Sequence, residues 1–302
     1  MVKNLVLENI SVGFKLPQGV FYAVDDVSLS LPGGNFTAII GESGCGKSVL
    51  GQAILNILPS GVVKKGSVLY NGEQVEKILS AFGIIPQNPS ESLNPVRKIG
   101  KQMQDILAVH QMADSDNSYK KQCLRLFGLE EAERVLAAYP HELSGGMLQR
   151  VLCAMAVSSK PEWILADEPT KGLDEQVGAV VRKNLLTIKQ DLHLSMLIIT
   201  HDIALAQEVC DDVLVMYAGQ VLEHNADIWH KPLHPYTKGF LQALPKNGLQ
   251  VIPGKAPVPG ESFTGCKFAA RCPYCTTRCK EEKPAMQQVG NAEVRCFLYA
   301  EG

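Results

Sequence analysis

The chain of 302 residues lacks three features that each mark a class of protein. It has no uninterrupted run of about 18 apolar residues, the length that a bilayer-spanning helix needs. Its 29 basic and 31 acidic residues leave a net charge of −2, so it lacks the excess of Lys and Arg that a basic nucleic-acid-binding face requires. Residues 1–5 lack the form of a signal peptide. We therefore expect a soluble, cytosolic protein of about two domains that binds no nucleic acid.

Cysteine is scarce through most of the chain and frequent at its end. Four of the nine cysteines lie in the first 265 residues, and the other five lie in the last 37. In a reducing compartment such a cluster indicates metal binding before disulfides. Prolines and glycines concentrate between residues 245 and 265, which predicts a linker. We therefore expect one domain over residues 1–244 and a cysteine-rich extension over residues 266–302.

The apolar pattern of the first domain predicts an α/β fold. Residues 163–166 and 196–200 are continuous apolar runs, which are typical of fully buried parallel strands. Residues 36–40 form another short apolar run, which leads into a glycine-rich turn. Residues from about 92 to 140 are polar and helical in character, without strand runs. The sequence has no internal repeat and no low-complexity tract.

A phosphate-binding pattern follows the strand expected at residues 36–40. Residues 41–48 read Gly-Glu-Ser-Gly-Cys-Gly-Lys-Ser and match G-x-x-x-x-G-K-[ST] in full. The glycines let the backbone wrap so that successive N–H groups point at the α- and β-phosphates. Lys47 then reaches the β- and γ-phosphates, and the Ser48 hydroxyl ligates Mg²⁺. The candidate nucleotide-binding residues here are Gly41, Gly44, Gly46, Lys47, Ser48 and Val49.

Two acids, Asp167 and Glu168, close the apolar run at residues 163–166. Removing two carboxylates from water needs compensation, which argues against a merely solvated face. Asp167 would hold Mg²⁺ through water, and Glu168 can polarise an attacking water. Alone, such a pair is also compatible with a structural role. The phosphate-binding pattern in the same chain favours the catalytic interpretation.

A second candidate anion site opens the helix expected after residue 145. Ser144, Gly145 and Gly146 would present a hydroxyl and backbone N–H groups at a helix N-terminus. Ser-Gly-Gly also caps ordinary helices, so the string is weak by itself. With the two preceding motifs it predicts a second phosphate contact.

Together these residues resemble the nucleotide-binding subunits of ABC transporters, over residues 1 to about 244. The resemblance implies a P-loop NTPase cassette with a RecA-like core, an antiparallel β subdomain and a helical subdomain over about residues 90–158. It also implies roles for Gln87 in the Q-loop, Asp174 in the D-loop and His201 as the switch histidine.

The adenine-stacking aromatic of this family falls at Phe14, with Tyr22 as the alternative. Two departures from the family pattern stand out. The signature carries Met147 where Gln is usual, and the D-loop carries Lys171 where small residues are common.

The resemblance implies ATP hydrolysis by a catalytic set of Lys47, Gln87, Glu168 and His201. Mg²⁺ would be held by Ser48, Gln87 and Asp167. Two chains would pair head to tail, so that ATP contacts Lys47 of one and Ser144 of the other. The implied partners are a related but non-identical ATPase, two transmembrane permease subunits and an extracytoplasmic substrate-binding protein. The chain would act peripherally at the cytoplasmic face of the inner membrane.

The cargo is indicated only by short motifs. Residues 230–237, His-Lys-Pro-Leu-His-Pro-Tyr-Thr, resemble the peptide/nickel importer ATPases. Residues 58–62, 87–89 and 144–150 resemble the nickel branch more than the dipeptide branch, so we expect uptake of nickel, free or chelated. A di- or oligopeptide importer is the alternative. A soluble ABC ATPase acting on DNA or ribosomes fits less well, because the chain has one cassette and no basic surplus.

The end of the chain resembles the C-terminal extension of oligopeptide importer ATPases, through Gly265-Cys-Lys-Phe and Arg271-Cys-Pro. In that family such thiolates are associated with an iron–sulfur cluster. The resemblance implies a [4Fe–4S] cluster, for which four thiolates are the required ligand set. Cys272 and Cys275 have a spacing equally suited to zinc, and free thiols or disulfides are a third alternative. The expected cluster ligands are Cys266, Cys272, Cys279 and Cys296.

Overall fold

The computed structural model describes residues 3–17, 19–74, 78–244, 248–258, 261 and 263–300. Parts of the expected linker, residues 245–247, 259, 260 and 262, lie outside the described residues. The chain divides into two compact units, each built from segments that are distant in sequence. One, the helical unit, comprises Met1–Lys3, Pro32–Phe36 and Glu76–Val209. The other, the P-loop unit, comprises Asn4–Leu31, Thr37–Val75 and Cys210–Gly302.

A parallel sheet with strand order β8-β7-β6 forms the centre of the helical unit. Its strands are β6 (Phe82–Ile85), β7 (Trp163–Asp167) and β8 (Ser195–Ile199). Every residue of β8 and the first four of β7 are buried. Parallel strands covered on both faces consist of continuous apolar residues, as expected from the sequence. The two apolar runs are thus confirmed as neighbouring parallel strands.

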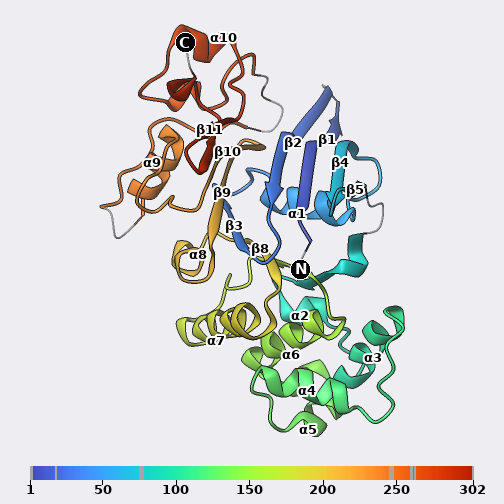
Figure 1. Ribbon diagram of the computed structural model, residues 1–302. Coiled ribbons are helices and arrows are strands. Elements are labelled where there is room, and N and C mark those ends of the chain that lie inside the picture. The colour runs from blue at the N-terminus through green and yellow to red at the C-terminus, as the bar shows by residue number, and fades with distance from the viewer. Residues whose placement is uncertain are drawn as a thin grey trace. The chain divides into compact units, whose positions relative to one another are not determined.

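Helices make up the rest of the helical unit, and Figure 1 shows α3 to α6 gathered in green at one end of it. Helix α6 is the central one: ten of its fourteen residues are buried, and it contacts α2, α3, α4, α7 and β6. Residues 92–140, which were expected to be helical, contain helices and no strand. The helical elements are η1 (Ile78–Ala81), α2 (Pro89–Ser92), α3 (Ile99–Val109), α4 (Ser118–Leu126), α5 (Ala132–Ala137), η2 (Pro140–Glu142), α6 (Gly145–Ser158), α7 (Glu175–Thr187), η3 (Ile188–Leu192) and α8 (Ile203–Val209).

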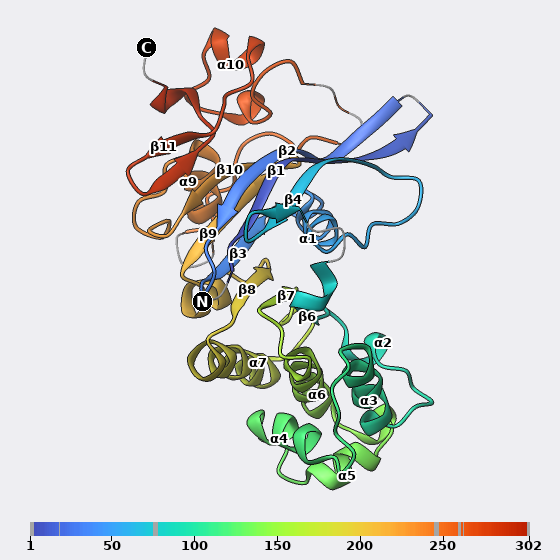
Figure 2. The ribbon, with the colours of Figure 1, turned by 45° about the vertical axis from the view of Figure 1, so that its right-hand side comes forward.

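The P-loop unit contains an antiparallel sheet with order β2-β1-β4-β5, against which α1 packs (Figure 2). Asn71 and Gly72 both have positive φ, 53° and 82°, in the turn between β4 and β5. This is the backbone of a tight hairpin, which Asn-Gly favours. The elements are β1 (Leu5–Leu16), β2 (Gly19–Leu31), α1 (Lys47–Leu55), β4 (Val63–Tyr70) and β5 (Glu73–Gln74).

A second set of strands in this unit has the order β11-β12-β10-β9-β3. Strand β3 pairs in parallel with β9, β9 and β10 form an antiparallel hairpin, and β12 pairs with β10. The cysteine-rich extension is therefore hydrogen-bonded into the sheet that carries the P-loop. These strands are β3 (Phe36–Gly41), β9 (Asp212–Tyr217), β10 (Gln220–Asn225), β11 (Gln287–Val289) and β12 (Ala292–Val294). The remaining elements are α9 (Pro235–Gln242), η5 (Ala269–Arg271), α10 (Thr277–Glu281) and η6 (Phe297–Tyr299).

An aromatic cluster joins the extension to this unit. The Phe268 side chain is 1% exposed, and its ring lies edge-on to the rings of Tyr217 and Tyr236 at centroid distances of 5.4 and 5.5 Å. Edge-to-face contacts of this kind add to the stabilisation from burial. Within the residues described, no helix is long and apolar enough to cross a membrane.

Candidate functional site

The P-loop connects buried strand β3 to helix α1, which begins at Lys47. Gly41, Gly44 and Gly46 have φ values of 148°, 77° and 105°, a region that side chains rarely occupy. A Cβ on Gly46 would lie 2.1 Å from the carbonyl oxygen of Ala23, so only glycine fits there. The glycines of the sequence pattern thus allow both the loop's conformation and its close approach to β2.

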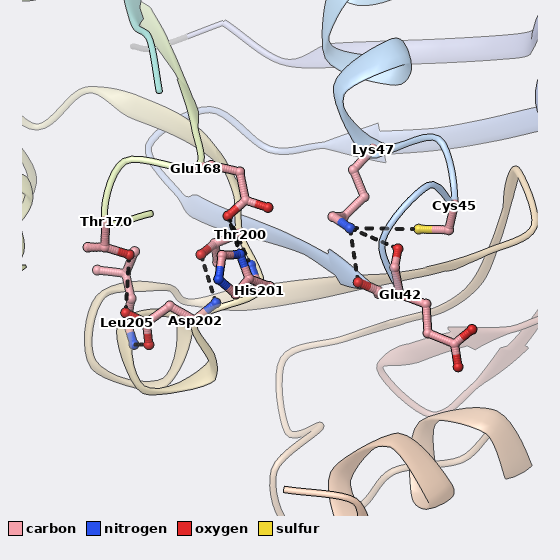
Figure 3. Close-up of polar contacts among 10 residues, drawn as sticks. Glu42, Cys45, Lys47, Glu168, Thr170, Thr200, His201, Asp202 and Leu205 are labelled. Carbon is pink, nitrogen blue, oxygen red and sulfur yellow. Dashed lines mark hydrogen bonds and ion pairs between the residues drawn. The ribbon is translucent and has the colours of Figure 1, made fainter. Parts of the chain in front are cut away.

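Lys47 is buried and folded back over the loop. Its Nζ donates hydrogen bonds to the carbonyl oxygens of Gly41 at 2.9 Å and Glu42 at 3.1 Å, and lies 3.9 Å from the Cys45 sulfur (Figure 3). The ammonium is therefore held at the loop by neutral acceptors. An ammonium group held in this position can bind a phosphate group. Ser48, the next residue of helix α1, is exposed.

A pocket of about 330 Å³ adjoins the loop and bears on the choice of adenine-stacking aromatic. Its lining includes Gly44 of the P-loop, Tyr22 of β2 and Phe263 of the linker. Phe14 is not among the residues that line it, and pairs instead with Phe21 along the β1–β2 hairpin. The structure thus brings the alternative, Tyr22, to this pocket.

In the helical unit, three predicted residues lie at or just beyond the carboxyl ends of neighbouring parallel strands. Gln87 lies two residues beyond β6, Asp167 ends β7, and His201 lies two residues beyond β8. The register pairs Ile85 with Ala166 and Asp167 with Ile199, so these ends share one edge of the sheet. Ligands of open α/β sheets bind at that edge.

Glu168 and His201 are in direct contact. The Nδ1 atom of His201 lies 2.6 Å from Oε2 of Glu168, and the backbone N–H of His201 donates to the same oxygen at 3.3 Å (Figure 3). The Glu168 side chain is 12% exposed and the imidazole 56% exposed, so the pair opens to solvent on the histidine side. Glu168 has φ of 48°, and its N–H donates to Ile199 at 2.8 Å.

The turn after His201 is fixed by its own hydrogen bonds. Asp202 accepts from the Leu205 N–H at 3.0 Å and from the Thr170 hydroxyl at 3.1 Å (Figure 3). The segment after Glu168 is thereby tied to the segment after His201. A carboxylate and an imidazole held in this way can orient and polarise a water molecule.

Ser144 and Asp174 both occupy helix N-caps. The Ser144 hydroxyl accepts from the Met147 N–H at 3.3 Å, and Asp174 accepts from the Val177 N–H at 2.9 Å. Ser144 therefore caps α6, one of the two roles that its sequence allowed. Apart from neighbouring residues of the same helix, no heavy atom comes within 4 Å of a Cβ added to Gly145 or Gly146. Ser144 and Gly145 are exposed, so the amino end of α6 is open to solvent.

Comparison with known proteins identifies the family. A model described as "ABC transporter" matches residues 24–171, and one described as "Oligopeptide/dipeptide transporter, C-terminal region" matches residues 222–279. The chain is 34% identical to the oligopeptide transport ATP-binding protein OppD of Haemophilus influenzae, over 98% of each chain. It is 36% identical to the dipeptide transport ATP-binding protein DppD of Escherichia coli, over 95% of this chain and 94% of that one. The chain belongs to the ATP-binding subunits of ABC transporters.

Solved structures agree with this assignment. A post-hydrolysis dimer of the ATP-binding cassette MJ0796 bound to ADP and Pi matches 73% of this chain and 97% of its own, with a TM-score of 0.62 and 25% identity. CbiO1 of Clostridium perfringens, part of the ABC transporter complex cbiONQ, matches 74% of this chain and 88% of its own, with a TM-score of 0.62 and 27% identity. The ABC cassette fold and ATP hydrolase activity expected from the sequence are thus confirmed.

The extension of this ABC ATPase forms a pocket of about 160 Å³ lined by cysteines. Cys275 does not line it. Burial raises the pKa of the Cys266 thiol to about 11 and also raises the pKa of Cys272. In the described part of the chain, no group of three or more His, Cys, Asp or Glu residues is placed to hold a single metal ion, so neither zinc nor an iron–sulfur cluster is confirmed. The cysteines lining the pocket are Cys266, Cys272, Cys279 and Cys296.

The structure also places residues at the P-loop that the sequence did not indicate. The Tyr236 hydroxyl accepts the Glu42 N–H at 3.2 Å, and Arg271 forms an ion pair with the Glu42 carboxylate at 3.2 Å. Arg271 lies 229 residues from Glu42 in the chain. No local spacing signals a contact over that separation.

Proposed function

We propose that this ABC ATPase powers the uptake of di- or oligopeptides. The observation that carries the proposal is the similarity, over nearly the whole chain, to relatives named for oligopeptide and dipeptide transport. The extension adds support, because it matches the oligopeptide/dipeptide C-terminal region. These findings favour the peptide alternative over nickel, which the short sequence motifs had indicated.

The proposed chemistry assigns each motif one task in ATP hydrolysis. Lys47 and the loop N–H groups bind the phosphates, and Tyr22 or Phe14 stacks on the adenine. Glu168 polarises the attacking water, with His201 holding its carboxylate in place. Ser144, Gly145, Gly146 and Asp174 serve the nucleotide of a paired ATPase chain. Mg²⁺, when bound, neutralises phosphate charge, and its proposed ligands are Ser48, Gln87 and Asp167.

The proposed assembly is a consequence of the importer assignment. The chain pairs with a second, related ATPase and docks onto two permease subunits that receive cargo from an extracytoplasmic binding protein. In this assembly the chain is a peripheral membrane protein at the cytoplasmic face of the inner membrane. In this arrangement the ATPase does not contact the cargo, so the partners determine substrate choice.

Uptake by the assembled transporter tests the proposed cargo. The ATPase is purified with its co-expressed permease subunits, reconstituted into proteoliposomes and supplied with the binding protein. We expect ATP-dependent accumulation of a radiolabelled tripeptide and no accumulation of radioactive nickel, with ATP-free vesicles as the control. Nickel uptake without peptide uptake would reject the peptide assignment and restore the nickel expectation.

We also propose that the cysteine pocket holds a [4Fe–4S] cluster. Four thiol side chains line one pocket, which is the donor set that such a cluster requires. His234 lines the same pocket, and its Nδ1 accepts the Tyr236 N–H at 3.0 Å, so Nε2 carries its hydrogen. By distance and angle that buried Nε2 has no full hydrogen bond among the described residues, although the ring interacts with the backbone of Arg295.

Iron content and the visible spectrum test the cluster, and Cys275 provides a matched control. Anaerobically purified protein should be brown and contain about four irons per chain, as the cluster formula requires. We expect Cys272→Ser to lose this iron and Cys275→Ser to retain it. Colourless, zinc-loaded protein would reject the cluster in favour of the zinc alternative. Equal iron loss in both variants would reject the proposed ligand set.

A further inference from the structure

The extension reaches the P-loop through one buried side chain. Nη1 of Arg271 lies 3.2 Å from both carboxylate oxygens of Glu42, the second residue of the loop. The Arg271 side chain is 8% exposed and that of Glu42 is 27% exposed. Partial exclusion of water strengthens the attraction between two charges relative to an exposed pair. The Arg271–Glu42 ion pair therefore stabilises the contact between the extension and the P-loop more than an ion pair between fully exposed side chains would.

Arg271 is itself held in place by its surroundings. Its Nε donates to the Pro253 carbonyl at 3.1 Å, and Nη1 also donates to the Tyr217 hydroxyl at 3.3 Å. The guanidinium carbon lies 5.7 Å from the centroid of the Tyr217 ring and 6.0 Å from that of Phe268. A planar guanidinium with several fixed donors orients its partner as well as attracting it. The position of the Glu42 carboxylate is thus set by the extension.

Glu42 transmits this restraint to the loop, because each of its polar groups is engaged. Its N–H donates to the Tyr236 hydroxyl at 3.2 Å, its carbonyl accepts from Lys47 Nζ at 3.1 Å, and its carboxylate contacts Arg271. Figure 3 shows the carboxylate pointing away from Lys47. Arg271 compensates the negative charge that Glu42 would otherwise leave beside a phosphate-binding loop.

We propose that Arg271 is a positioning residue, which holds the P-loop in its phosphate-binding conformation and neutralises Glu42. This inference rests on the proposed role of the P-loop in binding nucleotide. It assigns the extension a direct part in ATP affinity. Cys272 follows Arg271 in the chain and lines the cysteine pocket, so the segment that forms the pocket also carries the restraint.

Nucleotide affinity of the full-length protein tests the proposal, measured by titration with a fluorescent ATP analogue below the unfolding temperature. We expect Arg271→Ala to weaken binding about tenfold, a size typical of coupled buried contacts. Arg271→Lys should restore part of the affinity, because it returns the charge without the planar donors. Adding Glu42→Gln to Arg271→Ala should also restore part of it, because it removes the uncompensated carboxylate.

Arg295 is the matched control. It too is an almost buried arginine of the extension, 6% exposed, but it donates to the Asp26 and Pro284 carbonyls, neither of which belongs to the P-loop. Arg295→Ala should lower the unfolding temperature and leave nucleotide affinity unchanged. If Arg271→Ala behaves in the same way, Arg271 is only structural and the proposal is overturned. Lys47→Ala tests separately whether the P-loop binds nucleotide. If this variant binds ATP as tightly as the native protein does, the proposed function of the P-loop is overturned, whatever the result for Arg271.

Discussion

Glu168 combines a strained backbone with a close partner. A non-glycine residue with φ of 48° in the left-handed region costs energy, and such strain concentrates at functional sites. Here it turns the carboxylate toward His201, at 2.6 Å, immediately after the strand that carries Asp167. The positive φ and the contact together support the proposed role of Glu168 in polarising water.

Replacing the Glu168 carboxylate by an amide should separate ATP binding from hydrolysis. Glu168→Gln retains the size of the side chain but not its basicity, so we expect phosphate release to fall by at least about a hundredfold. Affinity for ATP should stay within about twofold, since general-base chemistry contributes little to ground-state binding. Phosphate-release kinetics and nucleotide titration measure the two quantities. Turnover at the native rate would remove Glu168 from the catalytic set.

Gly46 and Gly61 form a matched pair for testing the glycine requirement. Both have positive φ, 105° and 87°, but an added Cβ meets the Ala23 carbonyl at Gly46 and nothing within 4 Å at Gly61. Gly61→Ala should cost about 1–2 kcal/mol of backbone strain in the free energy of unfolding. Gly46→Ala adds a steric clash, so its cost should exceed that of Gly61→Ala and nucleotide binding should be lost. Urea denaturation compares the two, and equal costs would contradict the clash.

At the scale of secondary-structure elements, His224 connects three strands. Its ring nitrogens lie 3.3 Å from Asp212 of β9 and 3.4 Å from Glu293 of β12, while the residue itself belongs to β10. Burial alone would lower the pKa of His224, but hydrogen bonds and charge attraction from both carboxylates outweigh it and raise the pKa above 6.5. A protonated His224 thus stabilises the pairing of the extension with the sheet.

This arrangement predicts a pH-dependent contribution to stability. Because the folded-state pKa lies above the unfolded value, the stabilisation is fully present below about pH 6.5 and is lost as the pH rises through the folded-state pKa. The difference in unfolding free energy between native protein and His224→Gln should therefore be largest near pH 5.5 and shrink above neutrality. Denaturation across this pH range measures it. His230→Gln is the exposed control and should show little difference at any pH, and a constant effect of His224→Gln would contradict the linkage.

At the scale of the whole molecule, the extension is part of the P-loop unit, since that unit is assembled from segments at both ends of the chain. Phe268 anchors it among Tyr217 and Tyr236, and Lys267 contributes an ion pair with Asp25 at 2.9 Å. Such packing explains how a short cysteine-rich segment acquires a buried core that it could not form alone.

Removing the Phe268 anchor should therefore destabilise the P-loop unit. Phe268→Ala leaves a cavity among buried rings and should cost about 3–5 kcal/mol of unfolding free energy. Tyr274, also in the extension but 56% exposed, is the aromatic control, and Tyr274→Ala should cost less than about 1 kcal/mol. Chemical denaturation followed by fluorescence measures both. Similar small losses would show that the extension is only loosely attached.

Features with a local cause could be predicted from the amino-acid sequence. The P-loop glycines and the apolar runs of β7 and β8 reflect backbone conformation and burial on both faces of a strand. These properties depend on neighbouring residues, so one sequence suffices to predict them. The role of Asp167 and Glu168 could be predicted for the same reason, because residues at or just beyond the carboxyl end of a parallel strand lie at the sheet edge where ligands bind.

Contacts between residues far apart in the chain became visible only once the fold was known. The fold placed Tyr22 at the pocket beside Gly44, gathered four of the five terminal cysteines without Cys275, and joined Arg271 to Glu42 across 229 residues. Such contacts depend on how β10 and β12 pair and how the aromatic cluster packs, and no local spacing records them. What looked in the sequence like a separate tail is thereby a structural part of the unit that carries the P-loop.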